Sequence, residues 1–441
     1  MNSGNSPVPK IVRKISVLPL AAVMFFTVSG GPYGLEPLIG YAGSYAIPLL
    51  ILTPLVWDIP MILVVLELNS MMPVEGGYYE WVKRGLGVRW AFMEGCWTWF
   101  YSFVDLAIYP VLFVEYAAFF FPQIAQYKTP VCLVMIWLIA FLNIRGIVLV
   151  GRTALLLMVA VLIPFIILYY EGFIHPGFSV SHQHTGMTSL SLALFTIMWN
   201  CIGWDNATTY ADEVNRPVRS YLKAIILAFS AVYIFYISFT YLALHSGISA
   251  SEFAEKGIPY LGTLIGGNKL GGILSVGGLA SSVGIFCAVM LSVSRVPAVM
   301  GNDKLLPKIF TRLHKKYQTP HISIIACACI ISVLILNPLA DLFIMDICLY
   351  TAGIVLEFIA LIQLRKKAAD EFRPFRIPLK RNGLIFLFLL PVIVFSIALT
   401  GALFGSPDNR HAAIAAILAI IAAPIAWMFV RRKAEGERHK A

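Results

Sequence analysis

Apolar stretches long enough to cross the roughly 30 Å hydrocarbon core of a bilayer as helices recur along the whole chain. Twelve such spans are predicted, and their limits are 15–40, 45–66, 90–121, 129–143, 153–170, 188–211, 221–244, 270–300, 321–337, 338–364, 383–404 and 411–430. Hydrophobic residues make up 59% of the chain and charged residues 13%, which leaves too little polar surface for a water-soluble protein. The sequence therefore predicts an all-α membrane protein with twelve transmembrane helices in a lipid bilayer.

The distribution of basic residues predicts the orientation of these spans. If the N-terminus is cytoplasmic and every span crosses, the loops on the opposite side hold only Lys128, Lys256, Lys269 and Arg410. Arg295 falls within a span, and all other basic residues fall in seven cytoplasmic segments. This asymmetry favours an even number of spans, with both termini cytoplasmic, in a multi-pass protein of the cell membrane. Because the net charge of +10 is explained by this topology, the sequence argues against a nucleic-acid partner.

The first span contains a break, "SGGPYG", from Ser29 to Gly34. Glycine weakens a helix through backbone entropy and proline removes an N–H, so three Gly and one Pro within six residues predict local unwinding. In a bilayer, irregular backbone is stable only where protein or a water-filled cavity satisfies its polar groups. We therefore expect this segment to line a cavity.

A second break lies at the corresponding position of the sixth span, in "WNCIGWDN", where the apolar run is interrupted by Asn200, Gly203, Asp205 and Asn206. A single break has a simpler interpretation, a kink in a packed helix. Two broken helices at matching positions are typical of an inverted-repeat transporter with its site at the membrane midplane. Asn200, Gly203 and Asp205 are therefore candidate substrate-binding residues.

Five motifs of this chain are similar to those of a known family. They are "SGGPYGLE" in the first helix, "ELNSMMPVEGGYYEWV" after the second, "EGCWTWFYSFVDLAIYPVLFVEY" in the third, "WNCIGWDNATTYADEVNRP" in the sixth and "SRVPAVMGNDKLLPKIFTRLHKKYQTPHISI" from the end of the eighth. Together they resemble the amino acid–polyamine–organocation (APC) superfamily, most closely the branch of polyamine uptake transporters and L-type amino acid transporters. The resemblance covers nearly the whole chain.

The resemblance implies a LeuT-like fold of two inverted five-helix repeats followed by two further helices. The expected parts are a cytoplasmic N-terminal tail (1–14), a first repeat (15–171), a second repeat (187–364), the last two helices (382–432) and a cytoplasmic C-terminal tail (433–441).

Three departures from the family pattern limit what can be carried over. Polyamine members carry a glutamate in the second helix where this chain has Met61, although Asp58 lies three residues earlier on the same helical face. They also tend to place a lysine where this chain has Asn206. The fifth span, 153–170, lacks the lysine that some proton-coupled relatives use, so their coupling residue cannot be transferred.

The resemblance also implies roles for residues at the breaks. Ser29, Gly30 and Gly31 would bind a substrate carboxylate through free backbone N–H groups, helped by the positive end of the following half-helix. Trp199 occupies the position of an aromatic gate that could attract a cation, and an ordinary packed tryptophan is the alternative interpretation. Asp205 falls where some relatives hold an acidic residue linked to proton and substrate binding.

Carboxylates within or near the spans give the clearest chemical indication. They are Glu36, Asp58, Glu94, Asp105, Glu115, Asp205, Asp346 and Glu357. Each charge at the bilayer centre costs about 2.5–3.5 kcal/mol, and Arg295 is the basic residue placed among them. Such an excess is tolerable if some carboxylates are protonated, face water or await a cationic substrate.

Different roles are assigned to these carboxylates. Glu94, Asp346 and Glu357 are interpreted as structural, near an interface or paired across helices. Asp105 and Glu115 are ten residues apart in one span and therefore lie at different depths, so one could meet substrate and the other carry a proton. The candidates for substrate binding are Glu36, Asp105 and Asp205, and those for proton coupling are Glu115, Asp205 and Glu36.

These observations predict a secondary transporter that moves a cationic amine or amino acid by alternating access, with proton coupling expected from the family resemblance. A permease for neutral or other amino acids is the leading alternative, and a non-transporting sensor of the same fold is another. No P-loop or metal-ligand cluster is present in the sequence, so neither an enzyme activity nor a cofactor is expected.

Overall fold

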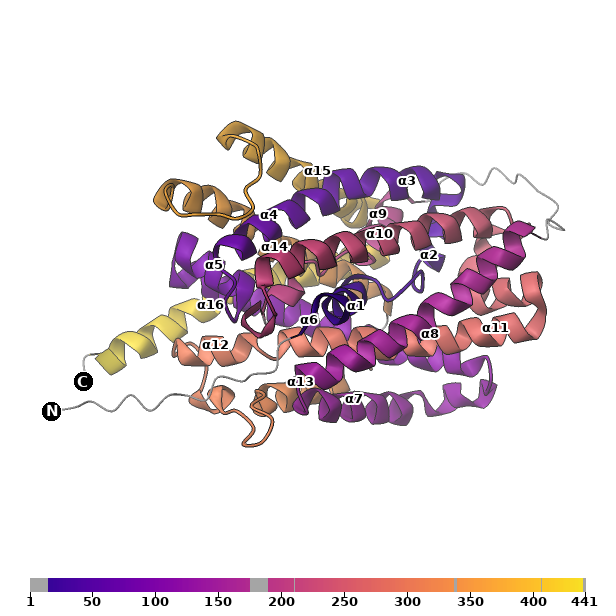
Figure 1. Cartoon of the computed structure of the whole chain (residues 1–441), viewed down its shortest axis with the longest axis horizontal. Helices are drawn as coiled ribbons and strands as arrows, with labels where there is room; N and C mark the ends of the chain where they lie inside the picture. Colours follow the sequence, from indigo (N-terminus) through magenta and orange to yellow (C-terminus); the bar gives the residue numbers. More distant parts are fainter. Residues whose placement is uncertain (1–14, 175–188, 210, 337–338, 406, 439–441) are drawn as a thin grey trace.

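The computed structural model describes residues 15–174, 189–209, 211–336, 339–405 and 407–438. Most helices run side by side along the long axis of the molecule (Figure 1). Their bounds are α1 Val17–Val28, α2 Glu36–Ala42, α3 Ala46–Thr53, α4 Ile59–Met71, α5 Gly77–Leu86, α6 Val88–Ala118, α7 Lys128–Ile144, α8 Ile147–Ile174, α9 Leu190–Trp199, α10 Pro217–Leu244, α11 Ala250–Val293, α12 Val296–Asn302, α13 His321–Leu334, α14 Leu339–Lys367, α15 Arg381–Gly405 and α16 Pro407–Arg438.

Within the described residues, nine helical segments are long and apolar enough to cross a membrane. Three shorter apolar helices, α1, α9 and α13, fall in three further predicted spans. Two of these three, α1 and α9, are the helices in which glycine-rich breaks were predicted. The helical, multi-pass architecture is therefore confirmed, while the number twelve and the inverted repeat stay predictions.

The predicted breaks are interruptions of the helical backbone. The first separates α1 from α2, and three of its glycines, Gly30, Gly31 and Gly34, have φ values of +66°, +101° and +93°. The second follows α9, where Gly203 has φ +94° before a 3₁₀ turn, Asn206–Thr209. Because a left-handed backbone is strained for any residue with a Cβ, glycine at these positions allows the chain to leave the helix.

Helix α11 is bent back on itself rather than straight. Its backbone is not helical at Gly257, Gly266 and Gly267, and a Cβ built on Gly262 would lie 3.1 Å from the Cα of Gly271. Two residues nine apart in a continuous helix would lie about 13.5 Å apart, so the chain folds back there. The U-shaped turn is visible at the right-hand end of Figure 1. The span predicted at 270–300 therefore begins just after the turn.

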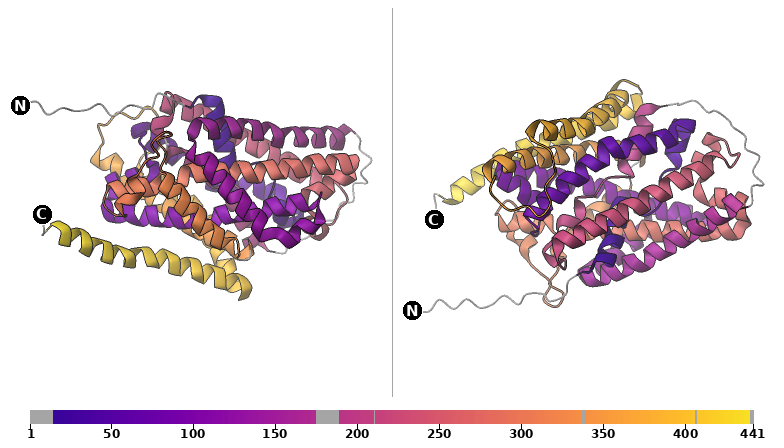
Figure 2. Two further views of the ribbon diagram at one scale, coloured as in Figure 1. Left: turned by 90° about the horizontal axis from the view of Figure 1, so that it is seen from below. Right: turned by 45° about the horizontal axis from the view of Figure 1, so that its top comes forward.

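The last two helices lie at the edge of the bundle. α15 packs on α9 and α16 packs on α14, and α16 runs along the outside of the molecule (Figure 2). This helix continues to Arg438, so the C-terminal tail predicted from residue 433 is helical over most of its length. The predicted N-terminal tail, 1–14, lies outside the described residues.

Candidate substrate and ion site

The two breaks lie in contact with each other inside the bundle. A Cβ built on Gly203 would lie 2.3 Å from the backbone carbonyl oxygen of Thr27, so only glycine allows this approach. Asn200 adds a hydrogen bond, because its Nδ2 donates to the carbonyl oxygen of Gly34 at 3.0 Å, across 166 residues of sequence. The contact is consistent with the prediction that both breaks contribute to one site.

The backbone N–H groups of the first break are used within the chain. The N–H groups of Ser29 and Gly30 both donate to the carbonyl oxygen of Phe25, at 2.9 and 3.0 Å. The N–H of Gly31 donates to Ser29 Oγ at 3.0 Å. The expectation that these donors are free is therefore wrong for this conformation. A substrate carboxylate would have to displace these bonds, and the role of the three residues in binding stays a prediction.

Glu36 fastens the first break to a neighbouring helix. It is the first residue of α2 and is 8% exposed. Its Oε2 accepts the N–H of Gly34 at 2.7 Å, and its Oε1 accepts the hydroxyl of Tyr116 on α6 at 3.2 Å. Both oxygens therefore have partners, and the carboxyl holds the turn between α1 and α2 in place.

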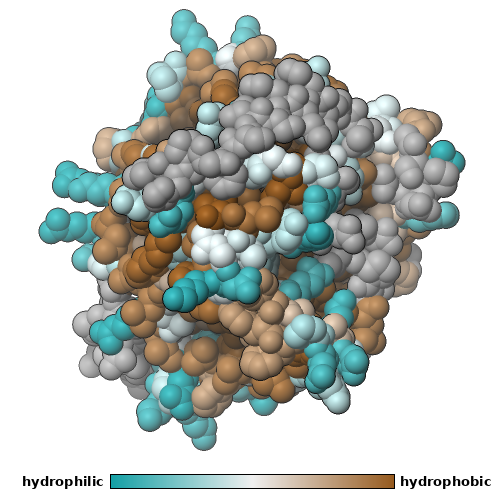
Figure 3. All heavy atoms as spheres, turned by 90° about the vertical axis from the view of Figure 1, so that its right-hand side faces the viewer, coloured by the Kyte–Doolittle hydropathy of each residue, from teal (hydrophilic) through white to brown (hydrophobic). Residues whose placement is uncertain are grey.

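A cavity of about 390 Å³ opens beside Glu36, near the end of the bundle opposite α5 and α12. Its lining includes the predicted proton-coupling residue Glu115, together with Tyr116, Lys256 and Phe343. The Nζ of Lys256 lies 2.7 Å from a carboxylate oxygen of Glu252, also at this end. Figure 3 shows this end of the molecule, where hydrophilic side chains are interspersed with apolar ones. The cavity therefore brings two of the predicted acidic residues to one opening.

Trp199 lies between this cavity and Asp105. The indole Nε1 donates to Asp105 Oδ1 at 3.3 Å, and the ring packs on Phe343 with centroids 4.5 Å apart. Asp105 Oδ1 also accepts the hydroxyl of Tyr109 at 2.5 Å. A Cβ on Gly34 would lie 2.8 Å from Trp199 Cζ3, so the tryptophan also covers the first break. This position is compatible with the gate interpretation and with that of an ordinary packed tryptophan, so the role of Trp199 stays a prediction.

Asp205 lies on the other side of the contact between the breaks and is tied to α14. Its Oδ1 accepts the hydroxyl of Tyr350 at 3.0 Å, and the Tyr350 oxygen accepts the N–H of Gly203 at 3.3 Å. Asp205 is 3% exposed, so this carboxyl is enclosed by protein. The structure therefore separates Asp205 from the group formed by Glu36, Trp199 and Asp105.

The sequence reasoning missed the contribution of α14. Asp346, one turn before Tyr350, lies close enough to Asp105 to interact with it electrostatically, and neither of its carboxylate oxygens has a hydrogen-bond partner among the described residues. The signal was present in the sequence, because Asp346, Tyr350 and Glu357 recur at helical spacing within an apolar span. Without the partner helix, that pattern could not be told from a structural pairing.

Two departures from the family pattern have structural roles. Asp58 ends a π-helical turn, Pro54–Asp58, and is fully buried. Its two oxygens accept Trp204 Nε1 at 3.0 Å and the hydroxyl of Tyr233 at 2.5 Å, which fastens the second break to α10. Asn206 Oδ1 accepts the hydroxyl of Tyr101 at 3.1 Å, so the amide joins the second break to α6.

The opposite end of the bundle, at α5 and α12, is held together by ion pairs. Lys83 on α5 donates to Asp303 at 2.7 Å and to Glu80 at 3.1 Å. Burial alone would lower the pKa of Lys83, and these two hydrogen bonds raise it above its ordinary value. Arg295, the basic residue predicted within a span, pairs with Glu213 at 2.7 Å.

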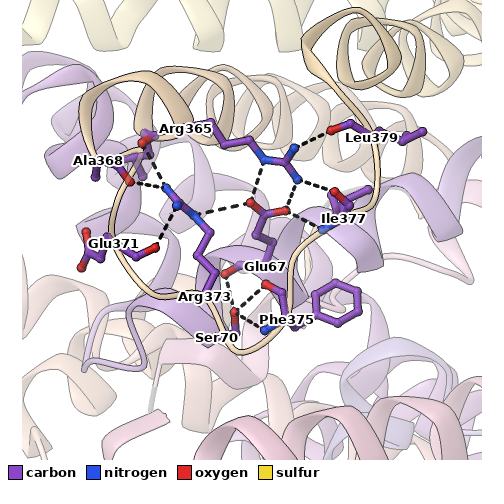
Figure 4. A network of polar contacts seen from close by, with 10 residues as sticks. Glu67, Ser70, Arg365, Ala368, Glu371, Arg373, Phe375, Ile377 and Leu379 are labelled. Carbon is purple, nitrogen blue, oxygen red and sulfur yellow. Dashed lines mark hydrogen bonds and ion pairs between the residues drawn. The ribbon is translucent and has the colours of Figure 1, made fainter.

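A second network closes the same end between α4 and the segment after α14 (Figure 4). Glu67 has no exposed surface and accepts Arg365 Nε at 2.8 Å, Arg365 Nη2 at 2.5 Å and the N–H of Ile377 at 2.9 Å. Arg373 Nε lies 3.6 Å from the same carboxylate. This network therefore ties α4 to the segment after α14, beside a second cavity of about 470 Å³ lined by Arg365, Lys366 and Ile377, whereas the cavity at Glu36 lies towards the other end.

Apolar helices suited to crossing a membrane and two interrupted helices that meet inside the bundle define a membrane transporter rather than an enzyme. Residues 15–429 match the model of the family described as amino acid permease. The chain therefore belongs to the amino acid permease family of the APC superfamily, as its motifs indicated.

Curated relatives agree with this assignment. A probable polyamine transporter of Arabidopsis thaliana is 34% identical over 407 residues, which are 89% of this chain and 84% of the relative. A polyamine transporter of the same plant is 31% identical over 88% of this chain and 80% of the relative. A serine/threonine exchanger of Bacillus subtilis is 25% identical over 84% of this chain and 86% of the relative. These names support a transporter of amines or amino acids.

Proposed function

We propose that this protein is a secondary active transporter that moves a cationic amine of the polyamine class across the cell membrane by alternating access, coupled to protons. In this proposal twelve helices cross the membrane, as two inverted five-helix repeats and two further helices, and both termini are cytoplasmic. The relatives named polyamine transporters support the substrate class.

One observation carries the proposal: carboxylates gather around the two breaks without basic partners. Asp105, Asp205 and Asp346 are each at most 4% exposed. Among the described residues none of the three forms an ion pair, because the buried Arg295 pairs with Glu213 instead. Buried negative charge of this kind favours a cation, either a proton or a substrate ammonium group. Trp199, which donates to Asp105, presents a ring that can also attract a cation.

The contrast between the two ends of the bundle supports alternating access. The cavity lined by Glu36 and Glu115 also reaches Gly34 of the first break from one end. At the other end the buried network of Glu67 ties α4 to the segment after α14, and the cavity beside it is lined by no residue of either break. A transporter that opens to one side at a time needs one end closed while the other admits substrate. We assign the closed end to the cytoplasm, because the basic segments fall there, and the cavity to the outer side.

An amino acid substrate is the alternative, supported by the relative named a serine/threonine exchanger. In that case the first break would bind the substrate carboxylate, with Ser29, Gly30 and Gly31 releasing their internal bonds. A non-transporting sensor of the same fold would bind substrate without moving it.

The test is uptake of labelled putrescine, spermidine, arginine and alanine into proteoliposomes, together with binding to the purified protein. Removing one partner of a desolvated charge pair costs about 2–5 kcal/mol, so Asp205→Asn should weaken binding of the amines by more than about tenfold. Alanine should be affected less if it binds at all. Glu371→Gln, at an ion pair whose two side chains are 42% and 34% exposed, is the matched control and should leave binding unchanged.

Three results would redirect the proposal. Tightest binding of alanine, with all four affinities unchanged in Asp205→Asn, would replace the cationic substrate by an amino acid. Binding without uptake would indicate a sensor. Uptake that does not respond to a pH gradient would remove the proton as the coupling ion.

A further inference from the structure

Helices α6 and α14 pack in an antiparallel register that pairs their polar side chains. The rings of Tyr101 and Tyr350 lie 5.2 Å apart, edge to face. Asp105 lies four residues after Tyr101 on α6, Asp346 lies four residues before Tyr350 on α14, and these two carboxylates interact electrostatically. In the other direction, the next polar pair in the same register is Glu94 with Glu357, and these two also interact.

The pair formed by Glu94 and Glu357 is enclosed, and within the described residues three of its four carboxylate oxygens have no hydrogen-bond partner. Each residue is 1% exposed. Glu94 Oε1 accepts the hydroxyl of Thr98 at 3.1 Å. Glu94 Oε2 and both carboxylate oxygens of Glu357 have no hydrogen-bond partner among the described residues.

Other groups that face the pair are acidic or phenolic. Tyr78 on α5 interacts electrostatically with Asp205, Glu94 and Glu357, and its buried hydroxyl also has no partner within the described residues. Asp205 interacts with both glutamates, and Tyr350 interacts with Asp205 and Glu357. On α6, Tyr101 faces Asp205 from the same level as Tyr350.

Among the residues that the structure describes, no cation is paired with these acids. In the described part of the chain, neither glutamate takes part in an ion pair; the nearby α5 lysine, Lys83, is engaged with Glu80 and Asp303. Two enclosed carboxylates that interact cannot both remain charged without a cation, because desolvation and mutual repulsion both favour protonation.

Close packing decides which cation fits. A Cβ built on Gly353, which faces the pair from α14, would lie 2.8 Å from Glu94 Oε1. On this side Glu94 therefore packs directly against the backbone of α14, with no space for the methylene chain of an amine. A proton needs no space of its own.

We propose that Glu94 and Glu357 form a shared proton-binding site, separate from the substrate site at the breaks. The inference rests on the proposed function for its role in coupling, while proton binding itself does not depend on the substrate. It assigns the coupling proton to a pair on α6 and α14 that interacts with Asp205, rather than to Glu115 or Glu36.

A chain of contacts connects this pair to the second break. Glu357 interacts with Tyr350, whose hydroxyl donates to Asp205 and accepts the N–H of Gly203. A change of charge at the pair therefore acts on Asp205 and on Gly203, which touches the last turn of α1 just before the first break. Such a connection makes substrate and proton binding depend on each other reciprocally.

The first experiment needs no substrate. Infrared difference spectra of the purified protein, titrated from about pH 5 to 8 across the range of a perturbed carboxyl, should contain the C=O stretch of a protonated carboxylic acid. Glu94→Gln and Glu357→Gln should each remove or shift that band, and Glu371→Gln should leave it in place. Bands that are identical in the wild type and in both pair variants would overturn the proposal.

The second experiment measures coupling. Putrescine is added to weakly buffered protein, and the protons taken up or released are followed with a pH dye. Coupled sites typically change each other's affinity by about 5–150-fold, so the wild type should show a clear proton change and a pH-dependent affinity. Both pair variants should lose the proton change and show a flat pH profile. Full retention of both signals would overturn the coupling role.

The two experiments give a different combination of results if the proposed transport function is wrong than if the proton site is wrong. If the wild type binds no amine or amino acid, the second experiment shows no signal in any variant, while the infrared band still tests the pair. Folding of each variant is checked by the reactivity of buried cysteines such as Cys201 and Cys327, which a thiol reagent reaches only in unfolded protein.

Discussion

Glu67→Gln should destabilise the closed end of the bundle strongly. The carboxylate accepts two hydrogen bonds from Arg365 and one from the N–H of Ile377, and a second guanidinium, that of Arg373, lies 3.6 Å away. Glutamine keeps one acceptor oxygen and presents an amide N–H₂ to the remaining donors. Breaking a buried ion pair by removing one partner costs about 3–5 kcal/mol, because an uncompensated charge stays buried.

The chain offers a matched control at the same end. Arg84 forms a bidentate ion pair with Glu371, with N–O distances of 3.1 and 2.6 Å, but these side chains are 42% and 34% exposed. Exposed pairs contribute about 0.2–1 kcal/mol, so Arg84→Gln should change stability little. Comparing the two variants therefore distinguishes the effect of losing a buried ion pair from that of losing an exposed one.

The assay is an unfolding titration of purified protein from mild detergent into sodium dodecyl sulfate, followed by labelling of the buried cysteines. Glu67→Gln should lower the free energy of unfolding by about 3–5 kcal/mol, and Arg84→Gln by less than about 1 kcal/mol. Equal losses in the two variants would refute the reasoning from burial. A loss in Arg84→Gln alone would refute it as well.

Two further predictions concern the contact between the breaks and its link to α14. Gly203→Ala should lower the free energy of unfolding by about 1–3 kcal/mol through backbone strain, and by more through the clash with the Thr27 carbonyl. Its control is Gly267→Ala, which should show the strain alone, because Gly267 has φ +69° and nothing lies within 4 Å of its Cβ. The same unfolding titration compares the two variants, and equal losses would contradict the clash. Tyr350→Phe leaves the Gly203 N–H without its partner and removes a donor to Asp205, so it should destabilise by about 1–3 kcal/mol and alter the pH profile of amine binding; an unchanged profile would contradict the link.

Local chemistry made much of the fold predictable. Each membrane helix makes its backbone hydrogen bonds within itself, so the length of an apolar run indicates where a helix lies. The basic loops predict which ends of the helices are cytoplasmic. The breaks were predictable for the same reason, because Gly30, Gly31, Gly34 and Gly203 carry in their own residue type the freedom to adopt positive φ. The fold-back of α11 at Gly266 and Gly267 was missed, since two adjacent glycines in an apolar run also fit a continuous membrane helix.

The assignment of polar partners was not predictable in this way. Glu36 was a substrate candidate by position, yet its oxygens accept Gly34 and Tyr116, and the second of these lies 80 residues away. Free N–H donors were expected at the first break, and Ser29 Oγ accepts one of them. A hydrogen bond depends on the distance and direction between two atoms, which sequence spacing does not give across separate helices.

The amino-acid pattern alone indicates a multi-pass helical membrane protein with two interrupted helices and an excess of acids over bases in its spans. Which of these acids lie together depends on how the helices pack. Glu94 and Glu357 were interpreted as structural groups, near an interface or paired across helices, with no partner named. The antiparallel register of α6 and α14 brings these two together across more than half the chain. Helix formation is local and can be deduced from neighbouring residues, whereas the environment of a buried carboxyl depends on whichever helix packs against it, and that environment decides whether it carries a charge.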